Sequence, residues 1–369
     1  VPEWGGKCYE DDVFEVFVLK RDGTTLKLPE AKEISLPAEG IVILDRVDCH
    51  DTRTGSSVFS SRRSARPYKF VTTFHEGMAL VSDSGQTRFG FVQRQNFELT
   101  IPLEFHEGRD FHDGVALVRR EEQWGIVDQT GMFRALPADA GRMSNLPQAD
   151  ILKHRSENSF TACPARDFRE GVAAVTSRRG QWGFVDTTGQ WVIPPQFDWA
   201  GSFSEGLAAV RVGLQYRYID RSGKTIIPGP FSCARRFSHG LAPVRLKDVF
   251  WGLIDTRGTC IVQPAWASVE SCSDGVVPFT VLNGARSCNR AGIYDVETRE
   301  ARVFDHLNFI KTFSEGIAVA RRGKYGFIDI NGNPVACDEL SRRTPNDALR
   351  WSEASSFRDG LALVESRHL

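Results

Sequence analysis

The sequence predicts an all-β protein built of tandem repeats of about 35 residues, each forming a small three-stranded sheet. One block, formed by Phe, two polar residues, Gly and an apolar run, recurs along the 369 residues. A second block, an aromatic residue, Gly, two apolar residues and Asp, follows most copies of the first. Helical periodicity is nearly absent. These three observations together favour repeated β-sheets over any helical architecture.

The first block places a glycine immediately before an apolar strand. The apolar run from Leu207 to Val210 is typical of a strand buried on both faces. Because Gly206 and Gly240 stand between polar residues and such strands, we expect a positive φ there, which a Cβ would penalise. The glycines of this block are Gly77, Gly114, Gly171, Gly206, Gly240, Gly275, Gly316 and Gly360, with a weaker copy at Gly40.

The second block predicts a strand, a tight hairpin and a third strand that often ends in Pro. We expect its Asp to accept backbone N–H groups and fix the hairpin, and the alternative is a ring of carboxylates for cations. The aromatic-Gly pairs are Phe89-Gly90, Trp124-Gly125, Trp182-Gly183, Trp251-Gly252 and Tyr325-Gly326. Variants occur at Tyr216-Arg217 and Ala291-Gly292. The Asp residues are Asp128, Asp186, Asp220, Asp255, Asp295 and Asp329.

Small residues recur in the first strand and large ones in the other two, as if the sheets converge at one side. This taper predicts sheets stacked radially, either as a closed propeller-like ring or as an open superhelix. The chain ends after a lone first strand, Leu361 to Val364, which a hairpin at Phe14 to Leu28 could complete.

The repeat defines the domain organisation. Residues 1–70 are interpreted as degenerate N-terminal repeats or a cap, and 71–369 as the array, with insertions at 132–167 and 336–356. Long loops on a rigid scaffold often carry binding residues. In the first insertion the candidates are Arg142, Asn145, His154 and Arg155, and a decorated surface loop is the alternative.

The two blocks resemble the bacterial WG-containing repeat family over roughly Phe74 to Val364. The resemblance implies a β-rich repeat protein with a binding role, and it supplies no catalytic residues. The sequence departs from the family pattern where Arg217 replaces the Gly of the pair and Ala291 replaces its aromatic residue. The copy around Gly275 also lacks the leading Phe.

Sequence signatures of catalysis are absent, since no HExxH, GxSxG, P-loop or helix-opening GxGxxG occurs. We therefore expect no enzyme, cofactor or metal site. Cys49 and His50 would point apart in a strand. The histidines just before the repeat glycines, His75, His112 and His239, are expected to serve the turn. We expect Trp124, Trp182 and Trp251 to pack between repeats, and exposed platforms for sugars are the alternative.

Composition restricts the partners and the compartment. The net charge of −1 provides no global attraction for nucleic acid, and no apolar run is long enough to span a membrane. The eight cysteines have irregular spacing without a CxxC, which favours free thiols in a reducing compartment. An excess of Arg over Lys is typical of a GC-rich bacterial coding sequence. These features predict a bacterial cytoplasmic protein, and the initial Val indicates a trimmed N-terminus.

The predicted function is a non-enzymatic protein-interaction scaffold, or a regulatory or sensing module, with another protein as partner. A glycan or cell-envelope binding module is the alternative. A hydrolase with an atypical site is a third class and requires polar residues from several repeats to converge in one pocket.

Overall fold

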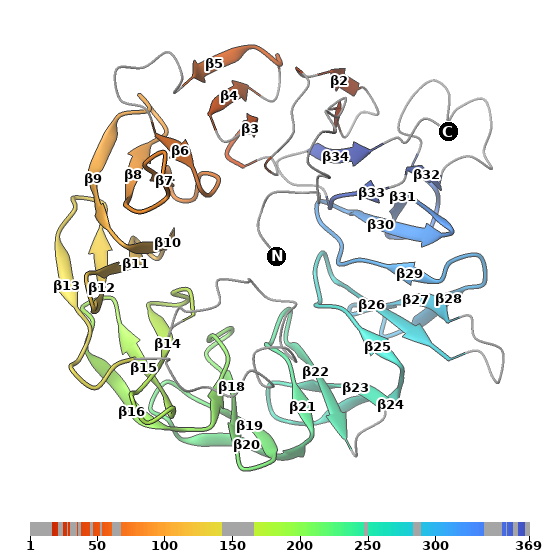
Figure 1. The fold of residues 1–369 in the computed structure, drawn as a ribbon. Helices are drawn as coiled ribbons and strands as arrows, with labels where there is room; N and C mark the ends of the chain where they lie inside the picture. The colour runs from red at the N-terminus through yellow and green to blue at the C-terminus, as the bar shows by residue number, and fades with distance from the viewer. Residues whose placement is uncertain are drawn as a thin grey trace. The chain divides into compact units, whose positions relative to one another are not determined.

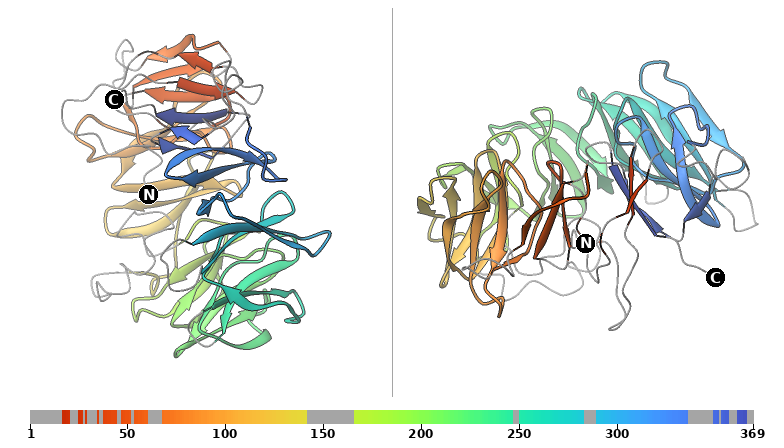
Figure 2. Two further views of the ribbon diagram at one scale, coloured as in Figure 1. Left: turned by 90° about the vertical axis from the view of Figure 1, so that its right-hand side faces the viewer. Right: turned by 90° about the horizontal axis from the view of Figure 1, so that it is seen from above.

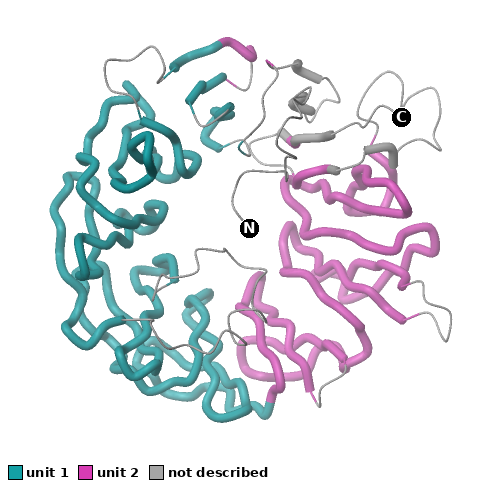
Figure 3. The backbone as a smooth tube through the Cα atoms, in the orientation of Figure 1, with its two compact units in different colours: residues 1–7, 33–50, 57–230 teal, residues 8–32, 51–56, 231–369 magenta. Residues whose placement is uncertain are grey.

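The computed structural model describes strands and turns, without a helix, in residues 17–20, 25–27, 29, 35, 38–44, 47–51, 54–60, 68–141, 166–246, 250–282, 289–335, 349–351, 353–356 and 361–365. The chain divides into two compact units (Figure 3). Unit 1 comprises residues 1–7, 33–50 and 57–230, and unit 2 comprises residues 8–32, 51–56 and 231–369. The prediction of an all-β chain of small antiparallel sheets is confirmed.

Unit 1 contains a succession of antiparallel sheets (Figure 1). Its first sheet is β3 (Ile41–Leu44), β4 (Asp48–Asp51) and β5 (Ser57–Ser60). The second is β6 (Lys69–Phe70), β7 (Met78–Ser82), β8 (Phe89–Gln93) and β9 (Leu99–Phe105). The third is β10 (Glu107–His112), β11 (Val115–Arg120), β12 (Gln123–Asp128) and β13 (Phe133–Ala135). Then follow β14 (Val172–Thr176), β15 (Trp182–Asp186) and β16 (Trp191–Phe197), and finally β17 (Trp199–Ala200), β18 (Ala208–Val212), β19 (Gln215–Ile219) and β20 (Thr225–Phe231).

Unit 2 repeats this organisation (Figure 2). One sheet is β21 (Cys233–Ala234), β22 (Leu241–Leu246), β23 (Phe250–Asp255) and β24 (Cys260–Trp266). The next is β25 (Ser268–Val269), β26 (Val276–Val281), β27 (Arg290–Asp295) and β28 (Ala301–Phe304). It is followed by β29 (Phe309–Ile310), β30 (Ile317–Arg322), β31 (Lys324–Asp329) and β32 (Leu349–Trp351). The last sheet joins β33 (Glu353–Ala354) and β34 (Leu361–Glu365) to β1 (Phe17–Lys20) and β2 (Thr25–Lys27).

Most sheets have one more strand than the three that the sequence predicts. The extra strand comes first and, except for the six-residue β10, is two residues long. In β17, for example, Trp199 pairs with Arg211 and Ala200 with Val210. Two residues are too few to produce an alternating pattern, so this strand leaves no periodicity in the sequence. The three expected strands correspond to β18, β19 and β20.

The last strand of the array pairs with the N-terminal hairpin. In unit 2, β1 and β34 are antiparallel, with Val18 opposite Leu363 and Lys20 opposite Leu361. The expected pairing of the lone final strand with the hairpin near the N-terminus is therefore confirmed. Residues far apart in sequence thus complete a single four-stranded sheet.

Each repeat glycine among the described residues is the second central residue of a two-residue hairpin turn. Ser204 and Leu207 exchange two backbone hydrogen bonds, of 2.9 and 3.2 Å. Between them, Glu205 and Gly206 both have positive φ, 56° and 76°. Positive φ at both central residues defines a type I′ turn, the type whose twist matches that of a β-hairpin. The predicted conformation is confirmed at Gly206 and also at Gly240, where φ is 74°.

The Asp of the second block fixes the next hairpin, as predicted. Asp128 Oδ1 accepts hydrogen bonds from the backbone N–H groups of Thr130 at 3.0 Å and Met132 at 3.1 Å. It also accepts one from the Thr130 hydroxyl at 2.6 Å. The hydroxyl of Thr130 lowers the pKa of Asp128, and the two backbone donors act in the same direction. Asp186, Asp220, Asp255, Asp295 and Asp329 bind the backbone of their own hairpins as well.

The glycine of the aromatic-Gly pair has a different role, because it makes room for backbone. A methyl group added at Gly183 would lie 2.5 Å from the carbonyl oxygen of Ile193 and 2.7 Å from the nitrogen of Pro195, both on the adjacent strand β16. Gly206, by contrast, has no atom within 4 Å of an added methyl group. One glycine of the repeat is therefore required by space and the other by φ.

The cores lie between successive sheets within each unit. The Phe of the first block is inserted there: the Phe203 ring is 1% exposed and meets Phe184 of the preceding sheet edge-to-face, with centroids 4.9 Å apart. Opposite it, Ala208 and Val210 of β18 join the same cluster. Equivalent Phe residues are fully buried at Phe74, Phe111, Phe168, Phe237 and Phe313. Each sheet is thus stabilised mainly by its neighbours.

Substitutions at these two glycines should give opposite side-chain preferences. We expect Gly206→Ala to lower the free energy of unfolding by about 1–2 kcal/mol through its left-handed φ. Gly206→Asn should cost less, because Asn adopts that region more readily. At Gly183, where space is limiting, Asn should instead be at least as damaging as Ala. Urea denaturation followed by tryptophan fluorescence measures all four variants, and the same rank order at both sites would contradict the assignment.

Candidate functional site

The type I′ turns of successive repeats are joined by their first central residue, which is usually acidic. Glu76 accepts hydrogen bonds from the backbone N–H groups of Asp113, at 2.8 Å, and Gly114, at 2.9 Å, in the next turn of unit 1. Asp113 in turn accepts one from Gly171 at 2.7 Å. We call these contacts the turn relay. Its other members are Glu39 to Gly77, Glu170 to Gly206 and, in unit 2, Asp274 to Gly316.

The turn relay satisfies backbone donors that the turns leave free. In a two-residue hairpin the central N–H groups point out of the ladder and would otherwise require water. A carboxylate accepts them as charge-assisted hydrogen bonds, which are stronger than bonds between neutral groups. Backbone carbonyls of the turns are bound as well: Gln129 Nε2 donates to the Glu76 carbonyl at 3.2 Å, and Arg221 donates to that of Glu170.

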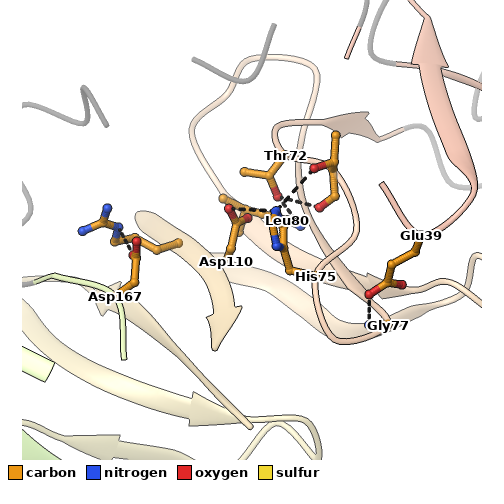
Figure 4. Close-up of polar contacts among 9 residues, drawn as sticks. Glu39, Thr72, His75, Gly77, Leu80, Asp110 and Asp167 are labelled. Atoms are coloured by element: carbon orange, nitrogen blue, oxygen red, sulfur yellow. Dashed lines mark hydrogen bonds and ion pairs between the residues drawn. The ribbon is translucent and has the colours of Figure 1, made fainter. Parts of the chain in front are cut away.

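A cluster of titratable side chains lies beside the turn relay in unit 1 (Figure 4). It consists of His75, Asp110, His112, Asp167 and Arg109, and we call it the His–Asp cluster. His75 is the first residue of the turn before β7. Arg109, Asp110 and His112 belong to β10. His75 Nε2 lies 3.6 Å from Asp110 Oδ2, and Arg109 Nε lies 3.0 Å from Asp167 Oδ1. The His75 and His112 ring centroids are 5.5 Å apart.

Burial lowers the pKa of His112 below its ordinary value of 6.5. The negative charge of Asp167 opposes this shift, whereas His75 and Arg169 reinforce it. His112 is therefore neutral at pH 7, and protonation brings a cation close to a second imidazole. The side chains of His75, Asp110, Arg109 and Asp167 are at most 21% exposed, so the Arg109–Asp167 ion pair is only partly screened by solvent.

The cluster does not have the geometry of a nucleophile–base–acid relay. Such a relay needs the hydroxyl and the carboxylate at opposite nitrogens of the imidazole. Here the Thr73 hydroxyl, 3.4 Å away, and Asp110 both approach Nε2 of His75. The arrangement holds His75 in place and can recognise charge. It is not arranged to activate Thr73.

Within the first insertion, the residues that flank segment 142–165 are bound to one edge of one strand beside this cluster. The backbone N–H of Gly141 donates to the Thr176 carbonyl, and that of Arg166 donates to the Ala174 carbonyl, both at 2.8 Å. Carbonyls two residues apart on a strand point to the same side. Both stems of the segment 142–165 therefore lie on the free edge of β14. The adjoining Asp167 then reaches Arg109 of the preceding repeat.

The predicted binding residues Arg142, Asn145, His154 and Arg155 lie outside the described residues. The sequence analysis also missed the His–Asp cluster, whose members are more than ninety residues apart at the extremes. One signal could have found part of it: Asp110 and Asp167 both stand immediately before the Phe of the first block. Equivalent positions in neighbouring repeats are brought together by stacking.

The repeated tryptophans have the packing role that the sequence predicts, and Trp182 packs against its core cluster from a half-buried position. Trp124 is 6% exposed and Trp251 is 9% exposed. Trp182 is half-buried, with the guanidinium of Arg166 5.5 Å from its ring centroid. The structure also places His239 in the centre of a turn, with φ of 53°, as expected of a turn residue. Cys49 and His50 are both buried within β4, and burial raises the pKa of the Cys49 thiol.

Comparison with known proteins identifies the repeat. The family model of the WG containing repeat matches residues 89–124, 182–213 and 216–249. The WG repeat is shown for these three segments. Each matched segment begins at an aromatic residue of the second block, so the family unit runs from one block of that kind toward the next. No curated protein matches the chain in sequence.

Solved structures resemble the chain in fold alone. A eukaryotic initiation factor, 9% identical, is matched over 86% of this chain and 94% of its own, with a TM-score of 0.50. The computationally designed Ika8 protein, 14% identical, is matched over 81% and 93%, with a TM-score of 0.45. BamB from Moraxella catarrhalis, 9% identical, is matched over 84% and 97%, with a TM-score of 0.42. The initiation factor is a β-propeller protein, a fold of stacked small sheets.

The part of the chain that the structure describes contains no helix of the length and apolarity that a membrane span needs. Within the same residues, no three His, Cys, Asp or Glu side chains come together as metal ligands would.

Removing one acid of the turn relay should expose the amides of the following turn. In Glu76→Ala, the N–H groups of Asp113 and Gly114 lose their acceptors, so we expect their hydrogen exchange to accelerate at least tenfold. Glu76→Gln keeps one acceptor oxygen and should give an intermediate rate. Amides of unit 2 serve as the internal control. Unchanged exchange at Gly114 in the Ala variant would contradict the turn relay.

His112 should make the protein less stable in mild acid. Because its folded pKa is lowered, the unfolded chain binds the proton first as the pH falls below 6.5. Stability is therefore complete above 6.5, falls as the pH drops toward the folded pKa, and levels off below it. His112→Gln should lose less unfolding free energy than the wild type between pH 7 and about pH 5. His75→Asn should move the pKa of His112, measured by NMR titration, back toward 6.5.

Proposed function

We propose that this WG-repeat protein is a non-enzymatic interaction module that binds another protein. The observation that supports it most directly is the position of the first insertion. Its two stems are anchored on one edge of β14, and Asp167 at its end belongs to the His–Asp cluster. A long segment anchored on a rigid scaffold next to charged, partly buried side chains is typical of binding surfaces.

The His–Asp cluster supports a binding role over a catalytic one. A hydrolase of the triad type would need a hydroxyl and a carboxylate on opposite sides of His75, and here both face the same nitrogen. What the cluster offers instead is fixed charge of both signs. Such charge favours recognition of a protein surface with complementary charge and orients it during encounter.

The glycan-binding alternative depended on exposed tryptophans. Burial of Trp124 and Trp251 removes two of the three candidate platforms, and Trp182 is stacked with Arg166. The compartment proposed for the protein is the reducing bacterial cytoplasm. Cys49, Cys233 and Cys260 are free thiols, which supports that proposal.

The experiment replaces residues 142–165 by a short Gly-Ser linker and keeps both stems. We expect the variant to fold, because the backbone hydrogen bonds of Gly141 and Arg166 remain. We also expect it to lose a partner protein that can be crosslinked to the wild type in native lysate and purified together with it. The matched control replaces residues 336–348 in the second insertion in the same way. Identical partners at identical yields for both variants and the wild type would contradict a binding role of the first insertion.

A charge-reversal variant provides a second readout. Arg109→Glu removes the ion pair with Asp167 without altering the insertion itself. If the cluster helps to recognise the partner, we expect the association rate to change and its dependence on salt to shift, as for other charges at interfaces. An unaltered rate at low salt would exclude the cluster from the interface.

A further inference from the structure

One repeat of unit 2 departs from the pattern at several positions that lie together in space. Around Gly275, Cys272 replaces the Phe of the first block, and Ala291 replaces the aromatic residue of the second. Tyr294 stands where the other repeats have Val or Ile. Cys272 and Tyr294 change the face that this repeat presents to β24 of the preceding sheet, whereas Ala291 packs on the opposite face, against the following sheet.

The hairpin of this repeat, like that between β8 and β9, is one residue longer than the regular hairpins. In the regular hairpin of β15 and β16, Asp186 N–H donates to the carbonyl of Gln190, whereas Asp295 N–H donates to that of Glu300, one residue further on. The turn glycine is missing, and Arg299 has the positive φ, 59°. Elsewhere the turn glycine packs over the preceding sheet, as Gly223 does over Ile193. Here that contact is replaced by a turn that carries a guanidinium.

Two small side chains leave space at the same junction. The residue opposite the end of the second-block strand is Leu99, Phe133 or Trp191 in three sheets of unit 1. The corresponding residues in unit 2 are Cys260, opposite Ile254, and Ala301, opposite Tyr294. A groove of about 490 Å³ results, lined by Cys260, Ile261, Val262, Gln263, Trp266, Tyr294, Arg299 and Ala301.

The walls of this groove define the ligand chemistry. Ile261, Val262 and Trp266 of β24 supply apolar surface, and Trp266 is held rigidly by stacking on Phe279, with ring centroids 4.2 Å apart. Arg299 is the one charged residue among the eight that line the groove. The Gln263 amide and the Tyr294 hydroxyl add hydrogen-bonding groups. The volume lies within the range of small-molecule sites, which combine an apolar lining with a few placed polar groups.

We propose that this groove binds a small organic anion with a flat apolar body, such as an aryl carboxylate or sulfonate. The apolar body lies against β24 and Ala301, and the anionic group pairs with the guanidinium of Arg299. The proposal concerns residues of unit 2 alone. It is therefore independent of the first insertion and of the protein-binding role.

The probe for this site is 1-anilinonaphthalene-8-sulfonate, an aryl sulfonate that fluoresces when it leaves water. We expect saturable binding of one probe to the full-length folded protein. Arg299→Asn, whose new side chain tolerates positive φ, should weaken binding about tenfold through loss of the charged partner. Arg257→Asn, an exposed arginine in the equivalent hairpin of the preceding sheet, is the matched control and should leave the affinity unchanged.

Filling the groove gives an independent test. Ala301→Trp introduces the residue that Trp191 provides at the same register elsewhere, and we expect it to abolish binding. Ala301→Leu provides a smaller filling if the Trp variant fails to fold, as judged by its thermal transition. Bound probe should also slow the alkylation of the exposed Cys260 thiol by iodoacetamide, measured by mass spectrometry. The proposal is overturned if binding is not saturable, if both filled variants bind like the wild type, or if Arg257→Asn weakens binding as much as Arg299→Asn.

Discussion

The turn relay is the interaction on which the arrangement of successive repeats depends. Hydrophobic contacts between sheets are strong but non-directional, so by themselves they allow neighbouring sheets to slide. A carboxylate that accepts hydrogen bonds from two N–H groups of the next turn, as that of Glu76 does, fixes the position of one sheet relative to the next. The type I′ turn makes this possible, because its positive φ values turn both the acid and the glycine amide outward. The dipeptide Glu-Gly thus determines both the conformation of its own turn and the position of the next one.

Sequence reasoning succeeds where the determinant is local. The positive φ of Gly206 and the hairpin role of Asp128 follow from residue types and their spacing, because the interacting groups lie within a few residues. It fails where the partner belongs to the next repeat. The acceptor role of Glu76 was invisible because a backbone amide has no sequence signature, and the contact of Arg109 with Asp167 spans an insertion. The strand β17 was missed because its two residues are too few to show the alternating pattern of a strand.

The departures from the repeat have different physical meanings. Cys272 is compensated nearby, because Phe279 stacks on Trp266 and occupies the junction. Ala301 is not compensated, and space remains beside it. Nothing in the described contacts explains why Arg217 can replace the glycine of the pair. Comparing each irregular residue with its counterparts at the same register therefore separates substitutions that the core absorbs from those that leave a cavity.

The pairing of β1 with β34 has a consequence for synthesis of the protein. A ribosome releases residues 17–20 long before residues 361–365, so β1 must wait without the neighbour that it has in the finished sheet. During this interval the edge of the hairpin is open to other strands, including those of a second nascent chain. Once the last strand emerges, the pairing closes a chain loop of nearly the whole sequence, which is entropically costly. Completion of this sheet therefore has to wait until residues 361–365 have been synthesised.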